Sequence, residues 1–425
     1  MEIKHNKTKK LNISFSGLLK WLAISMLVGG IVGSTTALFL SSLDQVTLWR
    51  SSHIWVVNFL PFAGLAIGLA YHYYGTESIK GHNLILESHQ EADNQTDSKK
   101  IPFMMAPLVF TSTLLTHVAG GSAGREGTAV QMGGAIADQF TSLFTLDTTA
   151  RKTLLIMGVS AGFAAVFGTP IAGAVFALEI MSFKSVKSTD IVSSFIVAYI
   201  AHYTCLAWHV HHANYSIISF PAISLATLLW TIVAGLIFGV TAFIFIYTGK
   251  IFEQLFSKIK FAPLRPFVGG IFIALFIVIA NSTKYIGLGI PSIVDAFITP
   301  AGHFDFAIKL LLTSFTLSAG FKGGEVTPLF FIGATLGNIL IWFIPIPMGL
   351  LAGMGFVAVF AGATHCAIAS VILGIELFGM QAGMYIGLAS LVAYFASGVN
   401  SIYSAQLKIG VKYELYNFIS KSKRL

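Results

Sequence analysis

Charged side chains are scarce in this chain, and that scarcity limits the class of protein. Asp, Glu, Lys and Arg together make up 10% of the 425 residues, whereas soluble domains contain about 25%. Hydrophobic residues reach 55%, and the mean hydropathy is +0.78. So few charges cannot cover a surface that faces water. The composition therefore predicts a polytopic membrane protein that has lipid as most of its solvent.

Cysteine is rare, and a phosphate-binding loop is missing. Cys205 and Cys366 are the two cysteines, and both stand in apolar surroundings, which excludes a disulfide framework and a Cys-rich metal site. The sequence contains no GxxxxGK[ST] loop, so we do not expect ATP to drive this protein. We expect a protein that is not an enzyme and that holds no cofactor and no metal.

Basic residues outnumber acidic ones and give a formal net charge of +8. They do not indicate nucleic-acid binding, because they lie in the tails and in short loops, which is the positive-inside pattern of cytoplasmic segments. The N-terminal segment is rich in lysine, and the chain ends KSKRL. We therefore expect both termini in the cytoplasm, residues 408–425 as a short basic cytoplasmic tail, and the protein in the cell membrane.

Apolar stretches follow one another along the chain, beginning at about residues 18–43. Several are too short to span a bilayer, which takes roughly 20 residues, and others are interrupted by some of the 41 glycines. Non-helical backbone at membrane depth is tolerated only where protein buries it or where it lines a cavity. We therefore expect half-helices that meet inside the membrane. The strongly polar stretch 88–100 predicts a solvated loop.

An internal repeat is visible in the sequence. Residues 155–180 match residues 352–377 at an offset of 197. This offset pairs Glu179 with Glu376, and each ends an apolar run. Their position favours a structural role, in which they cap or pair helix ends, over a functional one.

A second match lies upstream, at an offset of 199. It pairs Gly124, Glu126, Thr128, Gly134 and Ala135 with Gly323, Glu325, Thr327, Gly333 and Ala334. Two similar halves with Gly-broken segments at corresponding places indicate a binding site at their interface. We predict a single all-α transmembrane domain over residues 1–425, with repeat halves at about 15–210 and 217–407.

The segment GGSAGREGTAVQMGG, residues 120–134, predicts an anion site. Its glycines let the backbone turn, and the following residues can start a helix whose free N–H groups and dipole attract anions. Glu126 stands at this helix start, where its carboxylate can occupy the site and, once protonated, leave it. We predict that Glu126 is both gate and proton carrier; the alternative is a glutamate that only caps the first turn.

The segment GFKGGEVTPLFFIGATLG, residues 320–337, repeats this pattern. We expect the backbone amides of Glu325 and Val326 to point at an anion and the Thr327 hydroxyl to add a donor. Lys322 either raises the local concentration of anions or is an ordinary loop charge on the cytoplasmic side.

Two further segments carry weaker signals. Gly81 predicts a turn that leads into another short helix start, at His82 and Asn83. Tyr403, in NSIYSAQLK, can donate a phenolic hydrogen bond near the inner face of the membrane, or it can belong to the aromatic belt of the interface.

Histidines cluster in the segment WHVHHANY. His209, His211 and His212 are of the type that binds metals. No nearby Cys or acidic residue completes a set of ligands. We therefore interpret this segment as an extramembrane loop.

The GREG motif, the internal repeat, GGEVTP and the late SIYSA resemble the CLC family of chloride channels and proton-coupled anion transporters, from about residue 30 to residue 406. The resemblance implies an inverted repeat of tilted and broken helices, assembled as a homodimer with one pore per subunit. It implies that Glu126 is the external gating glutamate and Tyr403 the central tyrosine. The anion-binding residues would then be Gly81, His82, Asn83, Gly124, Arg125, Gly127, Val326, Thr327 and Tyr403.

The departures from the chloride-type pattern point to one branch of the family. Chloride-type members have GSGIP where this chain has GHNLI, so His82 replaces a serine. They have GREGP where Thr128 follows the GREG motif here, and GxFxP where this chain reads GEVTP. These substitutions resemble the CLC-F branch of bacterial fluoride/proton antiporters, in which Met or Asn is common at the position of His82. Proton-exchanging chloride-type members carry a second glutamate where this chain has Ile180, which leaves Glu325 as the possible inner proton site unless it only caps its helix.

The sequence therefore predicts an exporter of fluoride driven by entering protons. HF crosses membranes and dissociates in a more alkaline cytoplasm, so exchange against H⁺ would expel the trapped anion. Fluoride is small and strongly hydrated, and its site must offer strong donors, such as amides, the Thr327 hydroxyl and a protonated His82. Two alternatives stay open: a chloride channel or Cl⁻/H⁺ exchanger of the same family and, in a different class, a cation-coupled solute symporter built on inverted repeats.

Overall fold

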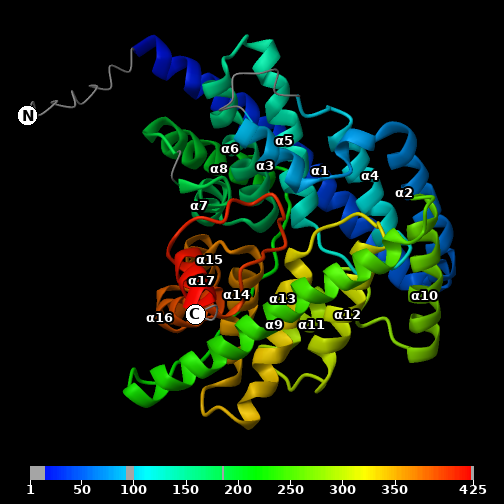
Figure 1. The fold of residues 1–425 in the computed structure, drawn as a ribbon, viewed down its shortest axis with the longest axis vertical. Coiled ribbons are helices and arrows are strands. Elements are labelled where there is room, and N and C mark those ends of the chain that lie inside the picture. The colour runs from blue at the N-terminus through cyan, green and yellow to red at the C-terminus, as the bar shows by residue number, and fades with distance from the viewer. Residues whose placement is uncertain (1–14, 92–99, 184–185, 423–425) are drawn as a thin grey trace, which may run out of the picture.

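The computed structural model describes residues 15–91, 100–183 and 186–422, and within these ranges the chain is built of helices (Figure 1). The first half contains α1 (Phe15–Ser52), the 3-10 helix η1 (Ile54–Phe59), α2 (Leu60–Tyr74), η2 (Thr76–Ser78), α3 (His82–Glu91), α4 (Met105–Val118), α5 (Glu126–Leu143), α6 (Thr148–Phe167), α7 (Pro170–Ile180) and α8 (Ser188–Ala207). The second half contains α9 (Leu225–Ser257), α10 (Leu264–Ala280), α11 (Ile290–Asp295), α12 (Asp305–Ser318), α13 (Val326–Ile339), η4 (Leu340–Trp342), α14 (Met348–Thr364), α15 (Ala367–Phe378) and α16 (Met380–Ala396), followed by α17 (Val411–Ser422).

The fold contains both long and short apolar helices. Five helical stretches in the described part of the chain are long and apolar enough to cross a membrane: Leu19–Ser52, Ile54–Tyr74, Thr148–Phe167, Ser188–Ala207 and Leu225–Ser257. Others, such as α7, α13 and α15, are apolar but have fewer than 18 residues. This finding confirms the expected all-α membrane fold with half-helices.

The two halves repeat the same packing. Helix α5 packs on α6 as α13 packs on α14, and α1 packs on α8 as α9 packs on α16. Contacts of α2 with α10 and of α7 with α15 join the halves. In Figure 1 the first half, coloured blue to green, lies mostly above the second half, coloured green to red. The interface between the halves therefore runs through the middle of the molecule.

Glycines let the repeated helices approach closely. A Cβ built on Gly133 would lie 2.1 Å from the carbonyl oxygen of Gly158, and one built on Gly333 would lie 2.0 Å from that of Gly355. Contact of this kind between backbones is the usual role of small residues in membrane helices. The two glycine pairs occupy equivalent places in the α5–α6 and α13–α14 packings.

The expected offset of 199 for the upstream match is wrong by one residue. Gly124 and Gly324 form an antiparallel β-bridge, in which the Gly124 amide donates to the Gly324 carbonyl at 2.6 Å and the Gly324 amide donates back at 2.8 Å. Helices α5 and α13 then begin at Glu126 and Val326, which is an offset of 200. Matching the two glutamates misplaced the register, because the structural counterpart of Glu126 is Val326.

Glu179 and Glu376 cap helices across the interface between the halves. The carboxylate of Glu179, near the end of α7, accepts hydrogen bonds from Ile368 and Ala369 at the start of α15, at 3.1 and 2.8 Å. Glu376, near the end of α15, accepts from the first amides of α7 at 3.0 and 2.7 Å. A carboxylate at a helix N-terminus is favourable, so the expected structural role is confirmed.

Two segments differ from their expected extents. The polar stretch expected to begin a loop at residue 88 instead continues helix α3 to Glu91, where Ser88 and His89 are buried against the protein; residues 92–99 of that stretch lie outside the described residues. Residues 408–425, expected as a basic tail, include helix α17, and its Lys412 is buried.

Candidate functional site

The carboxylate of Glu126 is held by donors from both halves of the chain. Glu126 is the first residue of α5 and is 2% exposed. Its Oε2 accepts hydrogen bonds from the amide of Thr327 at 3.0 Å and from that of Arg125 at 3.2 Å. Its Oε1 accepts from the Thr327 hydroxyl. An anionic group therefore occupies a cage of backbone and hydroxyl donors.

The local sequence explains why these donors are free. Arg125 is the N-cap of α5 and Glu325 the N-cap of α13, and the first four N–H groups of a helix have no partner within it. The two helix starts meet at the bridge between Gly124 and Gly324. Their free amides and dipoles converge on one place, where a negative charge is stabilised.

The amide donors differ from those expected. The site was predicted to use the amides of Glu325 and Val326, but the α13 amide that holds the carboxylate belongs to Thr327. The physical reason is that α13 begins one residue later than the match of the two glutamates implied. The predicted hydroxyl donor of Thr327 is in place.

A buried positive charge lies beside this carboxylate. Arg125 is 9% exposed, and its Nε lies 3.7 Å from Oε1 of Glu126. This nitrogen has no hydrogen-bond partner among the described residues. The distance is too long for a hydrogen bond, so Arg125 contributes through its charge and its amide.

A small cavity borders the Glu126 carboxylate. It has a volume of about 20 Å³, and Arg125, Glu126 and Thr327 line it together with His212 and Tyr215. This volume holds about one water-sized particle. Sequence reasoning missed His212 and Tyr215 as lining residues, because only the folded path of residues 208–224 brings them over the starts of α5 and α13.

The three histidines that were weighed as metal ligands lie in a loop. No group of three His, Cys, Asp or Glu side chains suited to a metal occurs in the described ranges. The Nε2 of His212 instead donates to the carbonyl of Ala165 at 2.9 Å. His209, His211 and His212 lie in the non-helical segment between α8 and α9.

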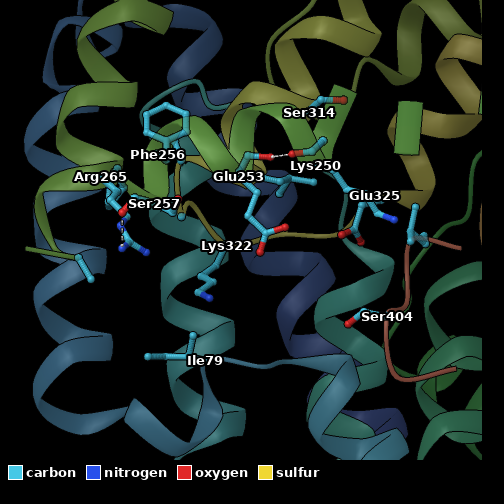
Figure 2. A pocket seen from close by; sticks show the side chains of 18 of the residues that line it. Ile79, Lys250, Glu253, Phe256, Ser257, Arg265, Ser314, Lys322, Glu325 and Ser404 are labelled. Carbon is cyan, nitrogen blue, oxygen red and sulfur yellow. Dashed lines mark hydrogen bonds between the residues drawn. The ribbon is translucent and has the colours of Figure 1, made fainter. Parts of the chain in front are cut away.

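A larger cavity opens beside the start of α13. It has a volume of about 520 Å³, and Figure 2 shows Glu253, Lys322 and Glu325 among its lining side chains. The Nζ of Lys322 lies 4.2 Å from the centre of the Tyr71 ring, a cation–π contact. Lys250, Glu253 and Arg265 were missed by sequence reasoning, since they lie far from the Gly-rich motifs along the chain.

The other predicted site residues meet near the first turn of α5. Gly81, at φ +54°, makes the turn from which α3 begins at His82. The His82 ring lies 5.3 Å from the ring of Tyr403, measured between centroids. A Cβ built on Gly127 would lie 2.8 Å from Cε1 of His82. Glycine at position 127 therefore allows α3 and α5 to touch.

Asn83 braces this arrangement. Its Oδ1 accepts a hydrogen bond from the backbone amide of Ala405 at 3.0 Å, and Nε2 of the Gln90 side chain donates to the Ala405 carbonyl at 2.8 Å. Both bonds tie α3 to the loop that carries Tyr403. The Asn83 side chain thus positions the loop through its oxygen.

Comparison with known proteins places the chain in a family. The family model described as "Voltage gated chloride channel" matches residues 63–398. A protein of Pseudomonas syringae pv. tomato, named chloride/fluoride channel protein, is 45% identical over 397 residues, which are 92% of this chain and 86% of that protein.

Solved structures agree with this placement. The crystal structure of a CLC-type fluoride/proton antiporter is 32% identical, covers 92% of this chain and 99% of its own, and superposes with a TM-score of 0.87. The structure of a slow cyanobacterial Cl⁻/H⁺ antiporter, 20% identical, covers 95% of this chain and 99% of its own with a TM-score of 0.77 and shares the fold. This chain is a multi-pass membrane protein of the voltage-gated chloride channel family, the CLC family.

Proposed function

We propose that this protein exports fluoride in exchange for entering protons. The observation that carries the proposal is the Glu126 carboxylate in its cage of donors, made by the Thr327 amide and hydroxyl and by the Arg125 amide. A cage that fits one anionic oxygen group offers the same charge-assisted hydrogen bonds to another small anion. Similarity to a protein named chloride/fluoride channel protein and to a CLC-type fluoride/proton antiporter supports fluoride as that anion.

Exchange follows from competition for the cage. When Glu126 takes up a proton, its carboxyl group loses the charge that the cage stabilises, and fluoride can take its place. When fluoride leaves, the ionised carboxylate can return. Because the proton and the anion alternate at one set of donors, movement of one is linked to movement of the other.

The chemistry of the cage favours fluoride over larger anions. Fluoride is strongly hydrated, so removing it from water requires several strong donors in its place. The Thr327 hydroxyl supplies one, and Val326 and Gly127 belong to the helix starts that supply the amides. The buried charge of Arg125 adds long-range attraction.

Glu325 is the candidate inner proton site. It lines the large cavity, whereas Glu126 lines the small one, so a proton moving between these cavities has a carboxylate at each. Glu325 is the N-cap of α13, but its side chain makes no capping hydrogen bond to this helix. This geometry supports a role in proton transfer over the alternative of a capping glutamate.

We also infer a homodimer in the cell membrane, with both termini in the cytoplasm. The large cavity would then open to the cytoplasm and the small one toward the outside. The loop of Gly81, His82 and Asn83, together with Tyr403, would lie on the inner part of the anion path. Light scattering of the purified protein in detergent tests the dimer, and labelling of single cysteines placed in α17 tests the orientation.

Efflux from proteoliposomes tests the proposed substrate. Vesicles loaded with potassium fluoride or potassium chloride are diluted into solutions without these anions, and ion-selective electrodes record the release of each anion. We expect rapid release of fluoride and slow release of chloride. Equal release of the two would favour a chloride-type transporter, and release of neither anion would contradict anion export.

A further inference from the structure

Gln131 fixes the orientation of the His82 ring. Gln131 belongs to α5, is 8% exposed, and its Nε2 lies 3.2 Å from Nδ1 of His82. The other ring nitrogen, Nε2, is buried and has no hydrogen-bond partner among the described residues. One ring nitrogen of His82 therefore contacts the side-chain amide of Gln131, and the other contacts no hydrogen-bonding group of the described residues.

This contact specifies where the proton of the imidazole resides. A side-chain NH₂ group donates hydrogen bonds, so Nδ1 of His82 must accept. In a neutral imidazole one nitrogen accepts and the other carries the hydrogen. The proton therefore resides on Nε2. A protonated ring would place an N–H against the N–H of Gln131, so this geometry disfavours the imidazolium that we expected as a donor.

The unpaired Nε2–H group lies at the start of α5. A Cβ built on Gly127, the residue after Glu126, would lie 3.4 Å from this nitrogen and 2.8 Å from the adjacent Cε1. The ring also packs against that of Tyr403 at 5.3 Å. A buried donor without a partner costs free energy. An acceptor that comes from outside the protein would remove this cost.

We propose that Gln131 is a positioning residue that holds His82 in its neutral Nε2–H tautomer, so that His82 donates a hydrogen bond to the transported anion. The proposal rests on the proposed function, because it names a further donor for the same path. A small anion with high charge density, such as fluoride, gains most from such a donor. The neutral ring donates through Nε2–H without taking up a second proton, and it therefore stays available when Glu126 is ionised.

Nuclear magnetic resonance of ¹⁵N-histidine in nanodiscs tests the tautomer without any transport. The His82→Gln variant identifies the His82 signals among those of the 12 histidines. We expect the Nε2–H tautomer at neutral pH and a shift of the Nε2 signal when sodium fluoride is added. In Gln131→Glu, whose carboxylate can only accept, we expect Nδ1 to be protonated. An Nδ1–H tautomer or an imidazolium in the wild-type protein would overturn the proposal.

Fluoride binding to paired variants tests the role of Gln131. Loss of a hydrogen bond between neutral groups corresponds to about a two- to tenfold change in affinity. We therefore expect Gln131→Leu to weaken the binding of fluoride by this factor. The same substitution in a His82→Leu background should have no further effect, since coupled residues give non-additive changes. Equal losses in both backgrounds would show that Gln131 acts only on the structure of α5.

Gln139 offers a matched control on the same helix. Its amide donates to the carbonyls of Ile101 and Ala135, away from His82. We expect Gln139→Leu to leave the fluoride affinity and the His82 tautomer unchanged. If the wild-type protein binds no fluoride, the proposed function fails, whereas the tautomer measurement still decides whether Gln131 orients His82.

Discussion

Thr327 binds the carboxylate of Glu126 through both its amide and its hydroxyl. The two residues stand 201 positions apart in the chain, and each lies in the first turn of a helix from a different half. The donors that hold this carboxylate therefore come from two helix starts, and neither half supplies all of them alone. The following predictions depend on this contact and on its surroundings.

Replacing Thr327 by valine removes one donor and nearly keeps the volume of the side chain. A hydrogen bond to a charged group contributes about 1.5–3 kcal/mol, so we expect the preference for fluoride over chloride to fall by about ten- to hundredfold. Anion efflux from proteoliposomes measures this preference. Thr335→Val is the control, because the Thr335 hydroxyl donates within α13, to the carbonyls of Phe331 and Ile332. An unaltered preference in Thr327→Val would mean that the hydroxyl does not meet the anion.

Replacing Glu325 by glutamine removes the candidate inner proton site. We expect the coupled proton flux to be lost while fluoride still binds, because the anion cage uses Thr327 and Arg125 instead. Simultaneous recording of fluoride and pH measures both fluxes. Glu253 lines the same cavity from α9, so Glu253→Gln is the control. Full coupled exchange in Glu325→Gln would place the proton route elsewhere.

Adding a methyl group at Gly127 should separate α3 from α5. The new Cβ would lie 2.8 Å from Cε1 of His82 and 2.9 Å from the Cα of Gly324, so the backbone must shift. We expect Gly127→Ala to lower fluoride efflux strongly. At Gly30, nothing lies within 4 Å of an added Cβ. Gly30→Ala should therefore leave transport unchanged and raise the free energy of unfolding, by at most about 1 kcal/mol. Equal effects of the two substitutions would contradict the close contact at position 127.

Helix α17 should be held more firmly as the pH rises. Its Lys412 Nζ is buried 2.7 Å from Nε2 of His365 and 3.0 Å from Oγ of Ser397, and it lies over the ring of Tyr394. Tyr413 contacts the other nitrogen of His365. Burial lowers the pKa of Lys412 from 10.5 to about 7. The undocked helix therefore binds more protons between these two values, and docking strengthens with increasing pH over that range.

Hydrogen exchange of the α17 amides measures this docking. After correction for the intrinsic effect of pH on exchange, protection should rise from pH 7 to pH 10, in the window that the pKa shift of Lys412 defines. In Lys412→Met the dependence should disappear, because the titrating group is gone. The same pH dependence in Lys412→Met would assign it to another group.

Much of the fold follows from local patterns. The lack of charge predicts the membrane class, and the match of Glu179 with Glu376 at an offset of 197 holds in the structure, where the two residues cap opposite helices. Short apolar runs between glycines predict the half-helices. Each of these features depends on residues that are close in sequence or on the periodicity of one segment.

The details of the site depend on contacts that no local pattern contains. Identical letters suggested that Glu126 and Glu325 are equivalent, but the backbone bridge between Gly124 and Gly324 sets the register one residue away. Gln131 lies five residues after Glu126 and resembles any polar residue of a helix, so only the approach of α3 reveals its contact with His82. His212 reaches the small cavity through the path of a loop.

Coupling of fluoride to protons through Glu126 is tested most directly by one measurement. Proteoliposomes loaded with potassium fluoride are diluted into weakly buffered solution without fluoride, valinomycin lets potassium balance the charge, and electrodes record fluoride and pH together. For the wild-type protein we predict that the outside becomes alkaline as fluoride leaves, because protons enter in exchange. For Glu126→Gln, whose side chain cannot carry a proton, we predict no change of pH linked to fluoride. Wild-type fluoride efflux without proton uptake, or unchanged proton uptake in Glu126→Gln, would contradict this mechanism.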